Sequence, residues 1–435
     1  MNNWSTQVAH GGEDWDGDRM PKRPSLFLML SAIATIATFP LYIFASGGAQ
    51  PSHGFFILFC LLFHKELLQH VMPEKWAIAY GPMRAAFCFV FVVFVVQLIY
   101  GITLESAEML KYIAFISFNF GYLVVMYRYI VTYRTTALNH VFIGMLLAVG
   151  LALMGVILNM GPNSGRQTGF FNNPNQLGYF GLIDVMLFLA CYSVCTLKYA
   201  RILALAGIAA SVYLILVSLS KAALVSAFLG LLLFAPSIKG RDLAFLGVLC
   251  VITLPFLAPK IIESNVVSRV VARIQDIGHD RDDSIAGRGY NRIKRYPEKL
   301  VFGAGEGEYR RFGALLEMHS TIGNIVFCYG VAGALFFFLF NLRCLKASPQ
   351  LFISIFAPLY AYGMTHNGIR FSAFWLAYAV FLAICELQRN DEGDFEIDTL
   401  SWSHLRDLVP GSRKRNYEPD DYDYQMIGQA ELVRS

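Results

Sequence analysis

The chain has 435 residues, of which 56% are hydrophobic and 15% are charged. Soluble domains carry about 25% charged residues, so the composition excludes a string of soluble domains and indicates a polytopic membrane protein. The formal net charge of +4 is small, and no basic run with interleaved aromatic residues occurs, so nucleic-acid binding is set aside.

The apolar runs predict an all-α protein with about twelve transmembrane helices. Residues 1–24 are a polar, acidic N-terminal tail, and the run after Lys22 and Arg23 lacks a small-residue cleavage site, so we interpret it as a first helix rather than a signal peptide. A span needs about 20 apolar residues. Runs of that kind lie near 25–45, 52–70, 83–102, 109–131, 138–160, 176–197, 199–218, 222–237, 241–259, 320–342, 350–366 and 371–387.

These runs divide the chain into a simple order of segments. Residues 25–259 hold the first nine predicted helices, and residues 320–387 hold the last three. Between them, residues 260–319 form a large polar loop. Residues 388–435 form a polar tail with little apolar periodicity, which we expect to be largely disordered.

The distribution of Lys and Arg predicts the orientation. With the N-terminus in the cytoplasm, the even-numbered connections carry eleven cations and the odd-numbered short connections carry four. The bias follows the rule that cytoplasmic loops are enriched in Lys and Arg. An even number of spans places both termini in the cytoplasm, and the 260–319 loop then faces the periplasm at the inner membrane of a bacterium.

The 260–319 loop contains 11 Lys and Arg and 9 Asp and Glu, whereas the flanking apolar runs contain almost none. Arginines on the outward face need a reason other than orientation. A solvated amphipathic helix at the headgroups is one explanation. A site for a diphosphate or another polyanion is the other.

Arg166 lies in the Gly- and Asn-rich stretch 161–175, with Asn173 as the candidate cap of a helix that starts at Pro174. A guanidinium beside the free N–H groups of a helix start can bind an anion, and Asn175 is a further candidate for substrate binding. The alternative is an arginine that extends to lipid headgroups.

Other outward cations could act with Arg166. Lys221 ends the run 216–221 and can supply a point charge to a phosphate. In the large loop, Arg288 and Arg292 are four residues apart and are candidates for the same anion. Each also has a structural interpretation as an interfacial or solvated cation.

Two histidines face outward in this topology. His319 begins the tenth predicted span and is a candidate general base, because histidine titrates near neutral pH. His366 and the nearby Arg370 are candidates for substrate binding. Asp184 lies within the sixth predicted span, where an acid is either functional or bonded to a neighbouring helix.

No metal or cofactor site is expected. The eight cysteines lack zinc-ligand spacing, and no P-loop, GxSxG or Asp-x-Asp motif occurs. The cluster at His279–Asp283 contains possible cation ligands, but its spacing is not diagnostic. A transferase built from these residues would stabilise a departing diphosphate with arginines rather than with a metal.

The order of these motifs resembles the superfamily of O-antigen ligases and polysaccharide polymerases. The matching residues are Arg166-x-x-Gly169-Phe170-x-x-x-Pro174-Asn175, Leu219-Ser220-Lys221, Gly287-Arg288, Phe302-Gly303-x-Gly305-x-Gly307, His319 and Gly330-Val331-x-Gly333. The motifs cover roughly residues 160–340, and the predicted topology covers the whole chain.

The resemblance implies a helical membrane glycosyltransferase that acts, without a metal, on a glycan carried by undecaprenyl diphosphate. Arg166 and Arg288 match arginines of the family, and His319 matches the histidine thought to be the base. Lys221 stands where members usually have arginine, and Ser320 stands where they often have asparagine. The implied reaction is a single inverting displacement in which Arg166, Lys221 and Arg288 hold the diphosphate.

Three functions remain open. A polymerase joins repeat units to one another, and this is the favoured hypothesis; a chain-length regulator is then a possible partner. A ligase transfers the glycan to lipid A-core or another acceptor. A transporter or flippase of a lipid-linked glycan would also need outward arginines, but it should show internal repeats and charged helices at mid-membrane, and no repeat is found.

Overall fold

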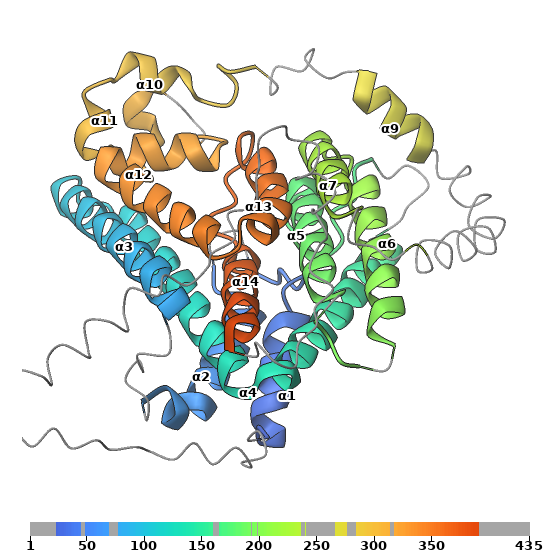
Figure 1. The fold of residues 1–435 in the computed structure, drawn as a ribbon. Helices are drawn as coiled ribbons and strands as arrows, with labels where there is room; N and C mark the ends of the chain where they lie inside the picture. Colours follow the sequence, from blue (N-terminus) through green and yellow to red (C-terminus); the bar gives the residue numbers. More distant parts are fainter. Residues whose placement is uncertain are drawn as a thin grey trace, which may run out of the picture. The chain divides into compact units, whose positions relative to one another are not determined.

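All regular elements that the structure describes are helices (Figure 1). The computed structural model describes residues 23–44, 48–68, 77–159, 165–192, 194–197, 199–235, 240, 266–275, 284–313 and 317–390. The helices are α1 (Leu26–Ala37), α2 (Pro51–Leu68), α3 (Ala77–Thr103), α4 (Ala107–Asn159), α5 (Pro174–Tyr192), α6 (Ala200–Ser218), α7 (Lys221–Phe234), α9 (Val266–Gln275), α10 (Asn291–Arg295), α11 (Lys299–Phe302), η3 (Tyr309–Phe312), α12 (Thr321–Ala347), α13 (Pro349–Gly363) and α14 (Ser372–Asn390). The predicted all-α class is confirmed for these residues, and the predicted span at 241–259 lies outside them.

In the described part of the chain, five helices are long and apolar enough to cross a membrane. They are Ile78–Thr103, Ala107–Asn159, Pro174–Tyr192, Ala200–Ser218 and Thr321–Ala347. α1 and α7 are apolar but shorter. These helices support a membrane-embedded protein, whereas the count of twelve crossings and the large periplasmic loop stay predictions.

α4 consists of two helices joined end to end. A continuous helix of its 53 residues would measure about 80 Å, whereas the hydrocarbon core of a bilayer is about 30 Å thick. The backbone leaves the helical region at Arg134, with φ 50° and ψ −131°. The break falls between the predicted spans 109–131 and 138–160, so the structure contains both segments but joins them without a loop.

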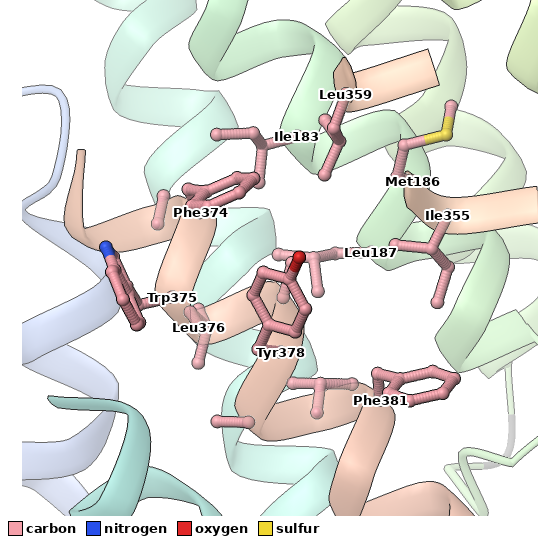
Figure 2. Packing of buried hydrophobic residues seen from close by; sticks show 14 of the residues in the cluster. Ile183, Met186, Leu187, Ile355, Leu359, Phe374, Trp375, Leu376, Tyr378 and Phe381 are labelled. Atoms are coloured by element: carbon pink, nitrogen blue, oxygen red, sulfur yellow. The ribbon is translucent and has the colours of Figure 1, made fainter. Parts of the chain in front are cut away.

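α5 lies in the interior of the helical assembly and is buried at every residue from Leu177 to Tyr192. A helix that is apolar on all sides is expected in such a position. Figure 2 shows α5, α13 and α14 side chains packed in one cluster, which includes Ile183, Met186, Leu187, Ile355, Leu359, Phe374, Trp375, Leu376, Tyr378 and Phe381.

Small residues allow α5 and α6 to approach closely, as is common between helices in membranes. A side-chain carbon at Gly181 would lie 2.9 Å from the carbonyl oxygen of Ser211. At Gly207 it would lie 2.6 Å from the ring of Phe188. The close contact between α5 and α6 therefore depends on these two glycines having no side chain.

The segment Gly303–Gly307 folds against a break in α12. Gly330, at φ 65° and ψ −166°, interrupts α12 and frees backbone carbonyls of the preceding turn. The N–H groups of Ala304 and Gly305 donate to the carbonyls of Phe327 (2.9 Å) and Cys328 (2.8 Å). All three glycines of the motif have positive φ, which glycine tolerates better than other residues. The segment is thus attached to α12 by backbone hydrogen bonds.

Candidate functional site

A cavity of about 210 Å³ brings together most of the predicted site residues. We name it the basic cavity. Its polar lining comes from seven side chains: Arg166, Asn175, Lys221, Arg273, Arg288, His319 and His366. Small or backbone contributions come from Leu219, Ser220, Ala222 and Gly287. Among the residues that the structure describes, four cations and no carboxylate line this cavity, a lining that favours an anion.

Arg166 is held between two motifs. Its Nε donates to the carbonyl oxygen of Ser218 (3.0 Å), and its terminal nitrogen donates to Oδ1 of Asn175 (2.6 Å). The N–H of Gln167 also donates to the carbonyl of Val217 (3.0 Å). These bonds fix the guanidinium beside the junction of α6 and α7.

The α6–α7 junction turns sharply to place Lys221. Leu219 ends α6 in the left-handed conformation, with φ 51° and ψ 32°, and Lys221 is the first residue of α7. Gly178 of α5 packs against this junction. The contact requires glycine, because a side-chain carbon at this position would lie 2.7 Å from Oγ of Ser218. The turn brings Lys221 to the basic cavity at a helix N-terminus, where backbone N–H groups also favour an anion.

The start of α5 follows the sequence prediction. α5 begins at Pro174, and Oδ1 of Asn173 accepts the N–H of Gln176 at 2.9 Å. This is an N-cap bond. The neighbouring Asn175 lines the basic cavity, and its carbonyl oxygen accepts the hydroxyl of Tyr362 at 3.0 Å.

Arg288 and His319 are joined through the main chain. The N–H of His319 donates to the carbonyl oxygen of Arg288 at 3.1 Å. The guanidinium of Arg288 donates to the carbonyl oxygen of Thr365 at 2.5 Å. The candidate base and the candidate phosphate ligand therefore occupy one rigid corner of the cavity.

Ser320 holds His319 at the start of α12. Its Oγ accepts the N–H of Gly323 (3.0 Å) and donates to the carbonyl of Gly363 (3.2 Å). The hydroxyl of Tyr290 lies 2.7 Å from the same Oγ. Serine is a favourable N-cap residue, so Ser320 has a positioning role at a place where the resembling family often has asparagine.

His366 lies beside the start of α12, at the end of a stacked aromatic column. Its ring stacks on Tyr362 with centroids 4.6 Å apart, and Tyr362 stacks on Tyr179 at 4.4 Å. The carbonyl of His366 accepts the N–H of Thr321 at 3.1 Å. His366 is among the residues that line the basic cavity, and its role in substrate binding stays a prediction.

Arg292 and Arg370 do not line the basic cavity. Arg292 is buried beside Tyr309, with its guanidinium carbon 5.5 Å from the ring centroid, and burial lowers the pKa of this arginine. Arg370 lies between two carboxylates, 3.7 Å from Oε1 of Glu306 and in direct contact with Glu317. The four-residue spacing of Arg288 and Arg292 indicates that both lie on one helical face. In the structure α10 is short, and the side chain of Arg292 is turned into the protein.

Two functional candidates were not among the residues chosen from the sequence. Arg273 of α9 lines the basic cavity, whereas Arg269 on the same helix donates to the carbonyl of Gly165 (3.4 Å). Glu306 is fully buried between two glycines and accepts the hydroxyl of Tyr329 at 2.6 Å. The four-residue spacing of Arg269 and Arg273 could have indicated Arg273 from the sequence, whereas no local sequence pattern indicated Glu306.

Among the described residues, no group of three or more His, Cys, Asp or Glu side chains is arranged to hold a metal ion. The candidate cluster at His279–Asp283 lies outside those residues. The side chains available for a reaction at this site are those that line the basic cavity.

In comparisons with known proteins, no family model and no curated protein sequence matches the chain. The fold is helical, its apolar helices suggest a membrane-embedded protein, and cations line the basic cavity. Any more specific function rests on that site.

Proposed function

We propose that the chain is a glycosyltransferase that uses a polyprenyl-diphosphate-linked glycan as donor. The observation that carries the proposal is the convergence of Arg166, Lys221, Arg288 and His319 on one cavity, whose described lining contains no carboxylate. These residues come from three separate segments that the charge pattern predicts to face the periplasm. Their proximity supports a common outward face for them.

In this proposal the diphosphate of the donor occupies the basic cavity. Arginine binds two phosphate oxygens at once through its planar fork, and lysine adds a point charge. Asn175 holds one edge of Arg166, so less freedom is lost when the ligand binds. The cations stabilise the negative charge that grows on the diphosphate as it departs, which is the main source of catalysis for such a group.

His319 acts as the general base. It takes the proton of an acceptor hydroxyl, and the oxygen attacks the anomeric carbon of the donor sugar. The bond from that carbon to the diphosphate oxygen breaks, and its electron pair leaves on the diphosphate. One displacement from the opposite face inverts the anomeric centre, and the reaction requires no oxidant or reductant.

The polymerase is our preferred form of this activity, acting at the periplasmic face of a bacterial inner membrane with both termini in the cytoplasm. Deletion of the gene separates it from a ligase. A strain without the polymerase retains single repeat units on its surface lipid. A strain without the ligase accumulates long polymer on the carrier.

Two measurements on Arg288→Ala test the proposal. In cells, the variant should lose high-molecular-weight surface glycan on gels. With purified protein, inorganic pyrophosphate should raise the thermal unfolding midpoint of the wild type and raise that of the variant much less. Arg310→Ala is the matched control, because Arg310 is exposed on the nearby η3 and does not line the basic cavity. Normal glycan and an undiminished pyrophosphate effect in Arg288→Ala would refute the proposal.

A further inference from the structure

A second cavity, of about 650 Å³, adjoins the basic cavity. Both cavities are lined by Asn175, His319 and His366, so His319 is accessible from each of them. We name the second one the neutral cavity, because the charges of its described lining balance one another. Its volume is within the usual range for small-ligand sites, about 300–1,000 Å³.

The neutral cavity has balanced charges. Among the described residues, Glu108 and Glu317 line it together with Lys111 and Arg370, two charges of each sign. Arg370 contacts Glu317 and lies 3.7 Å from Oε1 of the buried Glu306. Its guanidinium is therefore compensated inside the protein by these carboxylates.

Amide and aromatic side chains make up much of the remaining lining. Asn173 and Gln176 use their side-chain oxygens on backbone N–H groups at 2.9 and 3.2 Å, which orients their amide N–H groups for a ligand. Asn367 donates to Glu306 at 3.2 Å, and its Oδ1 accepts no hydrogen bond from the described residues. Amides both donate and accept, as hydroxyl-rich ligands require.

The aromatic lining forms a continuous wall. Tyr42 stacks with Phe371 at a centroid distance of 6.4 Å, and Phe371 lies 5.7 Å from Tyr179. Such faces give large apolar contact area while the tyrosine hydroxyls remain polar. A wall of this kind beside amides suits a sugar ring, which has an apolar face and a polar rim.

We propose that the neutral cavity binds an uncharged saccharide, the acceptor, with its reactive hydroxyl directed to His319. This inference rests on the proposed function and adds the class of acceptor. The two substrates are separated by charge: the diphosphate lies in the basic cavity and the neutral sugar lies in the neutral cavity. A heavily phosphorylated acceptor would meet Glu108 and Glu317 without a surplus of cations, so a glycan repeat unit fits better.

The test uses a substitution that fills the neutral cavity. Ala114 is an exposed residue of α4 that lines it, so Ala114→Trp reduces its volume without disturbing a buried contact. The matched control is Ala107→Trp, at an exposed residue of the same helix that does not line the cavity. The full chain is purified in nanodiscs and given its native lipid-linked donor. The acceptors are oligosaccharides released from the host polysaccharide, sorted into uncharged and acidic fractions.

Wild type and Ala107→Trp should transfer to the uncharged fraction. Ala114→Trp should raise the KM for that acceptor roughly tenfold or more, with pyrophosphate binding unchanged. An unchanged acceptor KM in Ala114→Trp, or preferential transfer to the acidic fraction, would overturn the inference about the acceptor. Neither result would contradict the proposed glycosyltransferase function. Absence of both transfer and pyrophosphate binding in the wild type would instead reject the proposed function.

Discussion

The N–H of His319 donates to the carbonyl oxygen of Arg288, 3.1 Å away. The candidate base and the candidate diphosphate ligand are thus linked by one backbone hydrogen bond, although 30 residues lie between them in the sequence. A second bond, from Arg288 to the carbonyl of Thr365, connects the pair to the segment that carries His366. The geometry of the site depends on these main-chain contacts as much as on side chains.

Loss of the Ser320 cap should weaken this arrangement. Ser320→Ala removes the hydroxyl that accepts the N–H of Gly323. An N-cap serine replaced by alanine typically costs about 1 kcal/mol. We expect a lower thermal unfolding midpoint and a lower kcat, with pyrophosphate binding preserved because Ser320 does not line the basic cavity.

Ser320→Asn is the control for that experiment, because asparagine also caps helices. It should restore most of the kcat that Ser320→Ala loses. Equal losses in both variants would show that the cap does not position His319.

Arg273 should contribute to anion binding from α9, which precedes Arg288 in the same predicted loop. Arg273→Ala removes one of four cations that line the basic cavity. A hydrogen bond to a charged group contributes about 1.5–3 kcal/mol, so pyrophosphate affinity should fall roughly tenfold or more. Isothermal titration of the purified protein measures the change.

Arg269→Ala is the comparison for Arg273, since it lies one turn earlier on α9 and bonds to Gly165 instead. It should leave pyrophosphate affinity within about twofold of wild type. A larger effect from Arg269→Ala than from Arg273→Ala would contradict the assignment of Arg273 to the cavity.

Gly330 should not tolerate a side chain. At φ 65°, an added carbon would lie 2.5 Å from the backbone nitrogen of Gly303 and 2.6 Å from the carbonyl of Val301. Gly330→Ala should therefore separate the glycine-rich segment from α12 and lower the unfolding midpoint strongly. Gly150→Ala, in open space within α4, should leave it equal or slightly higher, because alanine favours a helix by about 1 kcal/mol. Similar unfolding midpoints for Gly330→Ala and Gly150→Ala would contradict the packing of the Gly303–Gly307 segment against α12.

Glu306 should make stability depend on pH. Burial raises the pKa of this carboxyl above 4.5, against the opposing effects of Arg370 and Tyr329. Between pH 4.5 and the raised folded pKa, the folded chain binds more protons here than the unfolded chain, so this contribution to stability declines as pH rises. Glu306→Gln removes the titration. The unfolding midpoint of the variant relative to wild type should increase as pH rises from 4.5, and a decrease over that range would contradict this account.

The sequence predicted the all-α class, because long apolar runs have few alternatives to a helix in a membrane, and five of the described helices are long and apolar enough to cross one. It did not predict that Arg134 joins two spans without a loop, because the break depends on one backbone conformation. It predicted His319, Arg288, Arg166 and Lys221 as one site through the order of their motifs.

The remaining features depend on contacts between distant parts of the chain. The spacing of Arg288 and Arg292 indicated a shared helical face, but α10 has only five residues and turns Arg292 toward Tyr309. The burial of Glu306 depends on Gln97, whose side chain pairs with the Glu306 main chain at 2.9 and 3.0 Å across 209 positions. No local pattern contains that pairing.

The most direct test of the central claim is the turnover rate of His319→Ala with a polyprenyl-diphosphate-linked donor and a sugar acceptor. General bases typically contribute factors of about 10² to 10⁴. We predict that kcat falls by about 100-fold or more, while pyrophosphate still binds the basic cavity with an affinity close to that of wild type. A His319→Ala protein that transfers glycan at the wild-type rate would contradict the assignment.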